Sequence, residues 1–207
     1  MSYGIMARVV DIERIEGFFG SGDVGAFDRI AGWLRNEFPR LDAELPDAPP
    51  AYQLLRDLAL DPDYRRTQNT WSGDHAAKAI RLLELITGWF GDPDIQPNRY
   101  WSGMRYGWFE VVDQALAGAG SPARASDLTI AQPVAGLPMP IDFPIIHITT
   151  AEQARQWLAD TRDLDLSQTP ADERAAIEEM RDWMDYTADC AAHYPASSGN
   201  CLISFYG

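Results

Sequence analysis

The sequence predicts an α+β fold: a mostly helical single domain around a small sheet that pairs the N- and C-terminal strands. Two short apolar runs, at residues 4–10 and 201–206, have the length and composition of buried strands. Between them the chain shows helical periodicity, interrupted by glycine, proline and capping residues. Because strands at both ends of a helical chain can bury their apolar faces by pairing, we expect one domain over residues 1–207.

Most of the chain between the two strands is expected to be helical. Asp11 is a helix-capping residue that directly follows the first strand. Farther along, Thr149 with Glu152 predicts a capping box, and Thr169 followed by Pro170 predicts the start of a long helix. Apolar residues recur at helical spacing in the following stretches: 12–19, 24–38, 52–58, 75–90, 108–116, 154–158 and 176–191.

Two proline-rich stretches are expected to be loop excursions rather than domain linkers. Residues 39–50 and residues 133–144 each carry several prolines, and proline interrupts both helices and strands. Residues 128–134, at the start of the second excursion, are expected to form a short strand. The sequence shows no internal repeat, which agrees with a single domain.

The charge of the chain excludes some classes of partner and favours others. The chain has 31 acidic and 17 basic residues, so its formal net charge is −14. A surface this negative repels the phosphates of nucleic acids and anionic lipid head groups, and it attracts basic proteins and cations. We therefore expect neither a nucleic-acid partner nor a membrane partner, and a basic protein becomes the favoured partner class.

Several further features predict a cytoplasmic protein. No stretch approaches the ~20 apolar residues of a membrane span. The N-terminus lacks the basic region, apolar run and cleavage site of a signal peptide. The two cysteines, Cys190 and Cys201, fit no CxxC pattern and are expected to be reduced and buried.

Four segments of the chain resemble one family. They are Met-Ser-Tyr-Gly-Ile at the start, Gly-Trp-Phe-Glu-Val-Val-Asp from Gly107, Phe-Pro-Ile-Ile-His-Ile-Thr from Phe143, and Leu-Ile-Ser-Phe-Tyr from Leu202. Together they resemble a bacterial family of uncharacterised proteins that is similar in layout to the YfbM-like domains of unknown function. The resemblance implies an α+β domain with a small sheet and brings no catalytic residues. Some YfbM-like members are regarded as immunity proteins beside secreted toxins, so it also implies an immunity role.

The histidines offer two candidate catalytic residues. His75 follows Asp74 at a helix start, where Asp74 is a cap or, alternatively, an acid that orients a histidine base. His147 lies in an apolar stretch, where it is a buried histidine bonded to backbone or, alternatively, a catalytic base. His193, near a helix C-terminus, is explained by the helix dipole.

Known metal and cofactor motifs are missing from the sequence. The histidines form no HxxxH or HExxH pair. Asp92, Asp94 and Gln96 alternate like calcium ligands, but Pro97 and Gly103 replace the glycine and the bidentate acid that a calcium loop needs. No GxSxG or phosphate-binding glycine loop occurs, and the serines of the two Trp-Ser-Gly segments, Ser72 and Ser102, are expected to cap helices. We therefore expect no metal and no cofactor.

Two groups of side chains are candidate binding surfaces. The aromatic segment contains Trp101, Arg105, Tyr106 and Trp108, which either pack in the core and its rim or line an exposed groove. The last helix carries an acidic face that includes Glu178, Asp182 and Asp185. That face is either a solvated surface or a docking site for a basic protein.

These observations favour a non-enzymatic protein-binding module, concretely a cytoplasmic immunity protein that neutralises a basic toxin. The alternative is an enzyme or small-ligand-binding protein with an aromatic pocket near residues 100–109, aided by His75 or His147. A third hypothesis is self-association through an exposed sheet edge.

Overall fold

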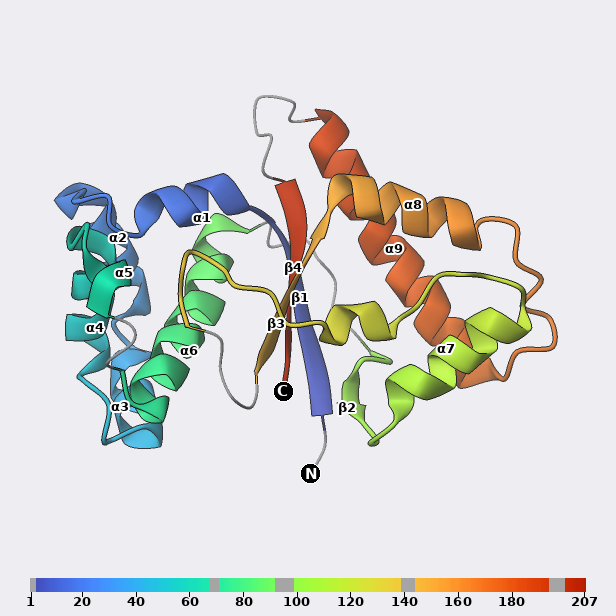
Figure 1. Cartoon of the computed structure of the whole chain (residues 1–207), viewed down its shortest axis with the longest axis horizontal. Helices are drawn as coiled ribbons and strands as arrows, with labels where there is room; N and C mark the ends of the chain where they lie inside the picture. The colour runs from blue at the N-terminus through green and yellow to red at the C-terminus, as the bar shows by residue number, and fades with distance from the viewer. Residues whose placement is uncertain (1–2, 68–70, 92–98, 139–143, 194–199) are drawn as a thin grey trace. The chain divides into compact units, whose positions relative to one another are not determined.

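The computed structural model describes residues 3–67, 71–91, 99–138, 144–193 and 200–207. These residues form helices and one small antiparallel sheet (Figure 1), which confirms the predicted α+β class. The chain is built from two compact units. Unit 1 comprises Met1–Asp11, Asp92–Gln132 and Ile145–Gly207, and unit 2 comprises Ile12–Gly91 and Pro133–Pro144.

The sheet lies in unit 1 and has the strand order β2-β1-β4-β3, with every pair antiparallel. The pairing of the N- and C-terminal strands is confirmed, with a register that runs from Ile5↔Tyr206 to Asp11↔Asn200. The N-terminal strand extends its predicted apolar run by one residue at each end, and the C-terminal strand extends its run by one residue at the start. The four strands are β1 (Tyr3–Asp11), β2 (Ser102–Met104), β3 (Ile145–Thr150) and β4 (Asn200–Tyr206).

The core of unit 1 gathers on one face of this sheet. Side chains alternate between faces along a strand, so the paired positions Ala7, Ser204 and His147 share one face. Ile5, Ala7 and Val9 of that face pack in one cluster with buried residues of the helices. The elements that supply them are α7 (Trp108–Gly118), the 3₁₀ helix η2 (Ser126–Thr129), α8 (Ala151–Thr161) and α9 (Ala171–His193).

Both predicted helix starts in this unit are displaced by one residue. The capping box of α8 is formed by Thr150 and Gln153, not by Thr149 and Glu152. Thr149 still belongs to β3 and is buried there, so the chain leaves the strand one residue later than predicted. Pro170 precedes α9, and its carbonyl accepts the hydrogen bond of Arg174 N at 3.0 Å.

The predicted strand at residues 128–134 is wrong, because η2 occupies its beginning. The Asp113 carboxylate accepts hydrogen bonds from Ala125 N (2.6 Å) and from the backbone and hydroxyl of Ser126 (3.2 and 2.5 Å). These bonds fix a helical turn where the apolar pattern alone suggested extended chain. Gln132 N donates to Ile146 O at 2.8 Å, but the described residues there form no strand.

The described part of unit 2 consists of helices joined by turns and loops. Part of the excursion predicted at residues 39–50 is a helix, since Pro39 lies in the first turn of α3, where a missing N–H breaks no helical bond. Of the second excursion, residues 139–143 lie outside the described residues. The helices are α1 (Ile12–Phe18), α2 (Val24–Leu34), α3 (Phe38–Glu44), α4 (Ala51–Leu60), α5 (Tyr64–Thr67) and α6 (Gly73–Phe90).

The two Trp-Ser-Gly segments have different structures. Ser72 caps α6, as predicted, and its hydroxyl accepts from His75 N at 3.1 Å; Asp74, the other predicted cap, lies in the first turn of the helix. Ser102 instead lies in the short strand β2, and the expectation that it caps a helix is wrong. The same tripeptide therefore has no common role in this chain.

A buried lysine ties the end of the first excursion to α6. Lys78 is 1% exposed, and its ammonium donates to Asp42 Oδ1 and to the carbonyl of Pro49, both at 2.9 Å. Asp42 Oδ1 also accepts from Ala51 N at 2.7 Å. Burial alone would raise the pKa of Asp42, but the hydrogen bonds from Lys78 and Ala51 and the charge of Lys78 together hold it below its usual 3.8.

Candidate functional site

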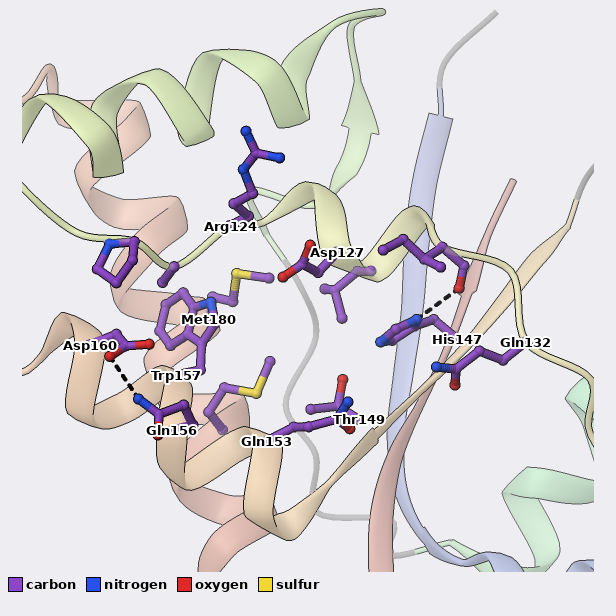
Figure 2. Close-up of a pocket in the computed structure, with 15 residues that line it drawn as sticks. Arg124, Asp127, Gln132, His147, Thr149, Gln153, Gln156, Trp157, Asp160 and Met180 are labelled. Carbon is purple, nitrogen blue, oxygen red and sulfur yellow. Dashed lines mark hydrogen bonds between the residues drawn. The ribbon is translucent and has the colours of Figure 1, made fainter.

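A pocket of about 390 Å³ lies within unit 1, among η2, β3, α8 and α9 (Figure 2). Its volume is in the range of small-molecule binding sites, and its lining combines apolar walls with polar groups that converge on the space. The polar residues that line it are Arg124, Asp127, Gln132, His147, Thr149, Gln153, Gln156 and Asp160.

His147 is the buried titratable group of this pocket. Its position in β3 places it on the sheet face that carries the core of unit 1, and it is 6% exposed. Its Nδ1 lies 2.8 Å from the carbonyl oxygen of Ile130. Because a carbonyl can only accept, Nδ1 carries the proton in the neutral ring and Nε2 carries a lone pair. Figure 2 shows the free edge of the ring pointing into the pocket.

Trp157 brings a buried hydrogen-bond donor to the same pocket. It comes from α8, is 8% exposed, and its Nε1 finds no hydrogen-bond partner among the described residues. Met180 and Met184 of α9 line the pocket beside it and are fully buried. A buried N–H without an acceptor is uncommon in folded proteins and calls for an explanation.

The charged residues lie toward the more exposed side of the pocket. Asp160 Oδ1 accepts from Gln156 Nε2 at 2.8 Å, and Asp127 is solvent-exposed on η2. Arg124 contributes one positive charge against these two carboxylates. Gln132 is fixed by its side-chain oxygen, which accepts from Ile148 N at 2.9 Å. With His147 neutral, the lining carries more negative than positive charge.

The serine that pairs with His147 in the sheet does not line this pocket. Ser204 pairs with His147 across the sheet, and its buried hydroxyl has no hydrogen-bond partner among the described residues. Ser204 is 1% exposed and does not line the pocket, so a substrate there would not reach it. The described residues also contain no group of three or more His, Cys, Asp or Glu placed to hold a metal ion.

The structure resolves the two interpretations of the aromatic segment residue by residue. Trp101 is fully buried in the core, where its Nε1 donates to Ala176 O at 3.1 Å. Trp108 is mostly buried, with the Arg105 guanidinium 5.6 Å from its ring centre, and Tyr106 is 87% exposed. Arg105 and Trp108 line a separate surface hollow of about 430 Å³ in unit 1. The segment is therefore core at Trp101 and Trp108 and surface at Tyr106.

The acidic side chains of α9 include both exposed carboxylates and one that is hydrogen-bonded within unit 1. Glu178, Asp182 and Asp185 are exposed, as a solvated face requires. Glu179, which adjoins them in the sequence, instead accepts from the backbone N–H groups of Arg99 (2.7 Å) and Tyr100 (2.9 Å). This carboxylate has a structural role within unit 1.

His75 belongs to unit 2, so the two candidate catalytic histidines lie in different units. Its ring stacks on Trp71, with centroids 4.0 Å apart and an angle of 8° between the planes. Its Nε2 is buried without a hydrogen-bond partner among the described residues. The side chain of His193 and the calcium-like residues Asp92, Asp94 and Gln96 lie outside what the structure describes.

Lowering the pH below about 6.5 is expected to destabilise the protein in part through His75. Burial lowers the pKa of His75 below its ordinary 6.5, with the nearby Asp57 carboxylate opposing this and Lys78 adding to it. The unfolded chain then binds more protons than the folded one, so stability is lost as the pH falls from 6.5. Urea midpoints from pH 8 to pH 5 should fall less steeply for His75→Gln; equal slopes would contradict this assignment.

Comparison with known proteins identifies a family but no characterised relative. The model of a family described as a domain of unknown function, DUF7691, matches residues 1–207. No curated protein and no solved structure matches the chain. Among the described residues, no helix is long and apolar enough to cross a membrane.

Proposed function

We propose that this chain, which belongs to the DUF7691 family, binds a small molecule in the pocket of unit 1. The observation that carries the proposal is the buried His147 ring, whose Nδ1 is held by Ile130 O while Nε2 faces the cavity. Convergent polar groups in a mostly apolar pocket are the usual mark of a ligand site. The pocket lies apart from the aromatic segment that the sequence suggested.

The test measures the Tm of the wild type and of His147→Asn with each member of a library of neutral, cationic and anionic small molecules. Asparagine keeps an N–H donor near the position of Nδ1 and deletes Nε2, so the bond to Ile130 O has a replacement. A ligand at 100 times its Kd should raise the wild-type Tm by about 5–10 °C. The same compound should shift the variant much less.

His75→Asn is the matched control, because it makes the same change in unit 2. The ligand-induced shift of this variant should equal that of the wild type. The proposal is refuted if no compound shifts the wild type, or if every active compound shifts His147→Asn equally.

We also propose a second, protein-binding role, in which the exposed carboxylates Glu178, Asp182 and Asp185 dock a basic protein. The net charge of −14 supports it, because complementary charge speeds association. The resemblance to YfbM-like domains supports an immunity protein of a bacterial cytoplasm that neutralises a basic toxin.

This second proposal predicts a partner that is sensitive to charge. The bait would be the full chain, expressed in its native host and purified at low salt. A basic protein should be recovered in a one-to-one ratio with the wild type, and in reduced yield with a triple variant, Glu178→Gln, Asp182→Asn and Asp185→Asn. Recovery that is independent of both salt and these substitutions would exclude docking through this face.

A further inference from the structure

The His147 side of the pocket requires a hydrogen-bond donor from the ligand. Because Nδ1 donates its proton to Ile130 O, the neutral ring presents only a lone pair to the cavity through Nε2. An acceptor group of the ligand placed there would leave two lone pairs facing each other. An N–H or O–H group of the ligand would satisfy this buried nitrogen.

The Trp157 side requires the opposite group. The Trp157 side chain lines the pocket, and its indole N–H is buried with no acceptor among the described residues. A buried donor of this kind costs stability when it stays unpaired. A carbonyl or ring nitrogen of the ligand would remove that cost, so the ligand needs an acceptor as well as a donor.

The rest of the lining limits the charge and shape of the ligand. The carboxylates of Asp127 and Asp160 outweigh the single positive charge of Arg124 and disfavour an anion. An ammonium group offers no acceptor for Trp157. Leu128, Trp157, Met180 and Met184 supply apolar walls, which suit a molecule with apolar faces and a polar edge.

We infer that the pocket takes an uncharged nitrogen heterocycle with both N–H and C=O groups on its edge, of the nucleobase class. This inference rests on the proposed small-molecule function. His147 Nε2 accepts from the ring N–H, Trp157 Nε1 donates to a ring acceptor, and the methionines cover the flat faces. The heterocycle is either a free base or a nucleoside, whose hydroxyl groups suit the exposed Asp127 carboxylate.

Calorimetric titration of the full chain with graded probes tests the ligand side. The probes are uracil, hypoxanthine, their nucleosides uridine and inosine, uridine monophosphate, and 1,3-dimethyluracil. At least one base or nucleoside should bind. If uracil or uridine binds, 1,3-dimethyluracil, which lacks both N–H groups, should bind uracil's site about 10–100-fold more weakly, because Nε2 stays unpaired. The monophosphate should bind more weakly than its nucleoside, and the preference between base and nucleoside identifies the natural form.

Trp157→Phe tests the protein side with two opposed effects. Removing the unpaired indole N–H offsets part of the cost of the lost ring volume, so the Tm without ligand should fall less than in Trp101→Phe, while affinity for the bound heterocycle falls about 10-fold. Trp108→Phe is the matched control, because Trp108 Nε1 is also buried without a partner among the described residues and lies outside this pocket. This control should keep the wild-type affinity.

The outcomes separate this inference from the function on which it rests. If the library yields a ligand that loses affinity in His147→Asn but is anionic or lacks N–H groups, the heterocycle class is wrong and the pocket remains a binding site. If a heterocycle binds the Trp157→Phe variant as tightly as the wild type, the assigned orientation is overturned. If neither library nor probes distinguish His147→Asn from the wild type, both proposals fail.

Discussion

Replacing Trp101 with alanine should lower the free energy of unfolding by about 3–5 kcal/mol, the usual range for a large aromatic residue removed from a core. Trp101 is fully buried in the core cluster of unit 1, with ring centroids 5.3 Å from Phe109 and 6.3 Å from Trp183. Its indole N–H also donates to Ala176 O. Chemical denaturation followed by circular dichroism measures the loss.

Two further variants identify the source of this loss. Trp101→Phe keeps a ring and should cost about 1–3 kcal/mol, since it loses the hydrogen bond and part of the volume. Tyr106→Ala, in the same aromatic segment but 87% exposed, should change stability by less than about 0.5 kcal/mol. A Tyr106→Ala variant as unstable as Trp101→Ala would contradict the division of this segment into core and surface.

Lys78→Met is expected to destabilise unit 2 by about 1–3 kcal/mol despite the similar length and greater apolarity of methionine. The substitution leaves the Pro49 carbonyl without its 2.9 Å donor and removes the cation from Asp42. Asp42 is partly exposed, so water recovers some of that interaction. The urea midpoint of the variant measures the effect.

The pH response and a same-helix control sharpen this second test. With Lys78 in place, the lowered pKa of Asp42 adds stability above pH 3.8 that is lost as the pH falls through and below that value. Lys78→Met should lose most of this acid dependence. Arg81→Met, on the same helix but partly exposed, should cost less than about 1 kcal/mol. Equal losses for both variants would show that burial of Lys78 contributes nothing.

The pairing of β1 with β4 was predictable because each strand is a short apolar run that no helix pattern explains. The same reasoning failed at residues 128–134, where hydrogen bonds donated to the distant Asp113 carboxylate by Ala125 and Ser126 select a 3₁₀ turn. It also failed at α3, because proline in the first turn of a helix has the same sequence signature as proline in a loop. In both cases the decisive contact or position is invisible to local periodicity.

The candidate site was predictable in part. The sequence singled out His147 and anticipated its bond to backbone, which the contact with Ile130 O confirms. Trp157 was expected as an inward-facing helix residue, but periodicity does not distinguish a side chain that fills the core from one that lines a cavity. Gln132 comes from a segment predicted as a strand, and Asp127 directly precedes that segment, so their convergence with His147 had no sequence signal.

The β1–β4 ladder has a consequence for how the chain is made. It joins Ile5 to Tyr206, residues about 200 positions apart, and such non-local pairing is slow to form. During synthesis on the ribosome, β1 therefore emerges long before β4. Until β4 is made, the edge of β1 that pairs with it stays unpaired. Helix-rich unit 2, whose contacts lie mostly within one continuous stretch, is placed to fold during that interval. Synthesis speed and chaperone access should therefore affect the yield of folded protein chiefly through unit 1.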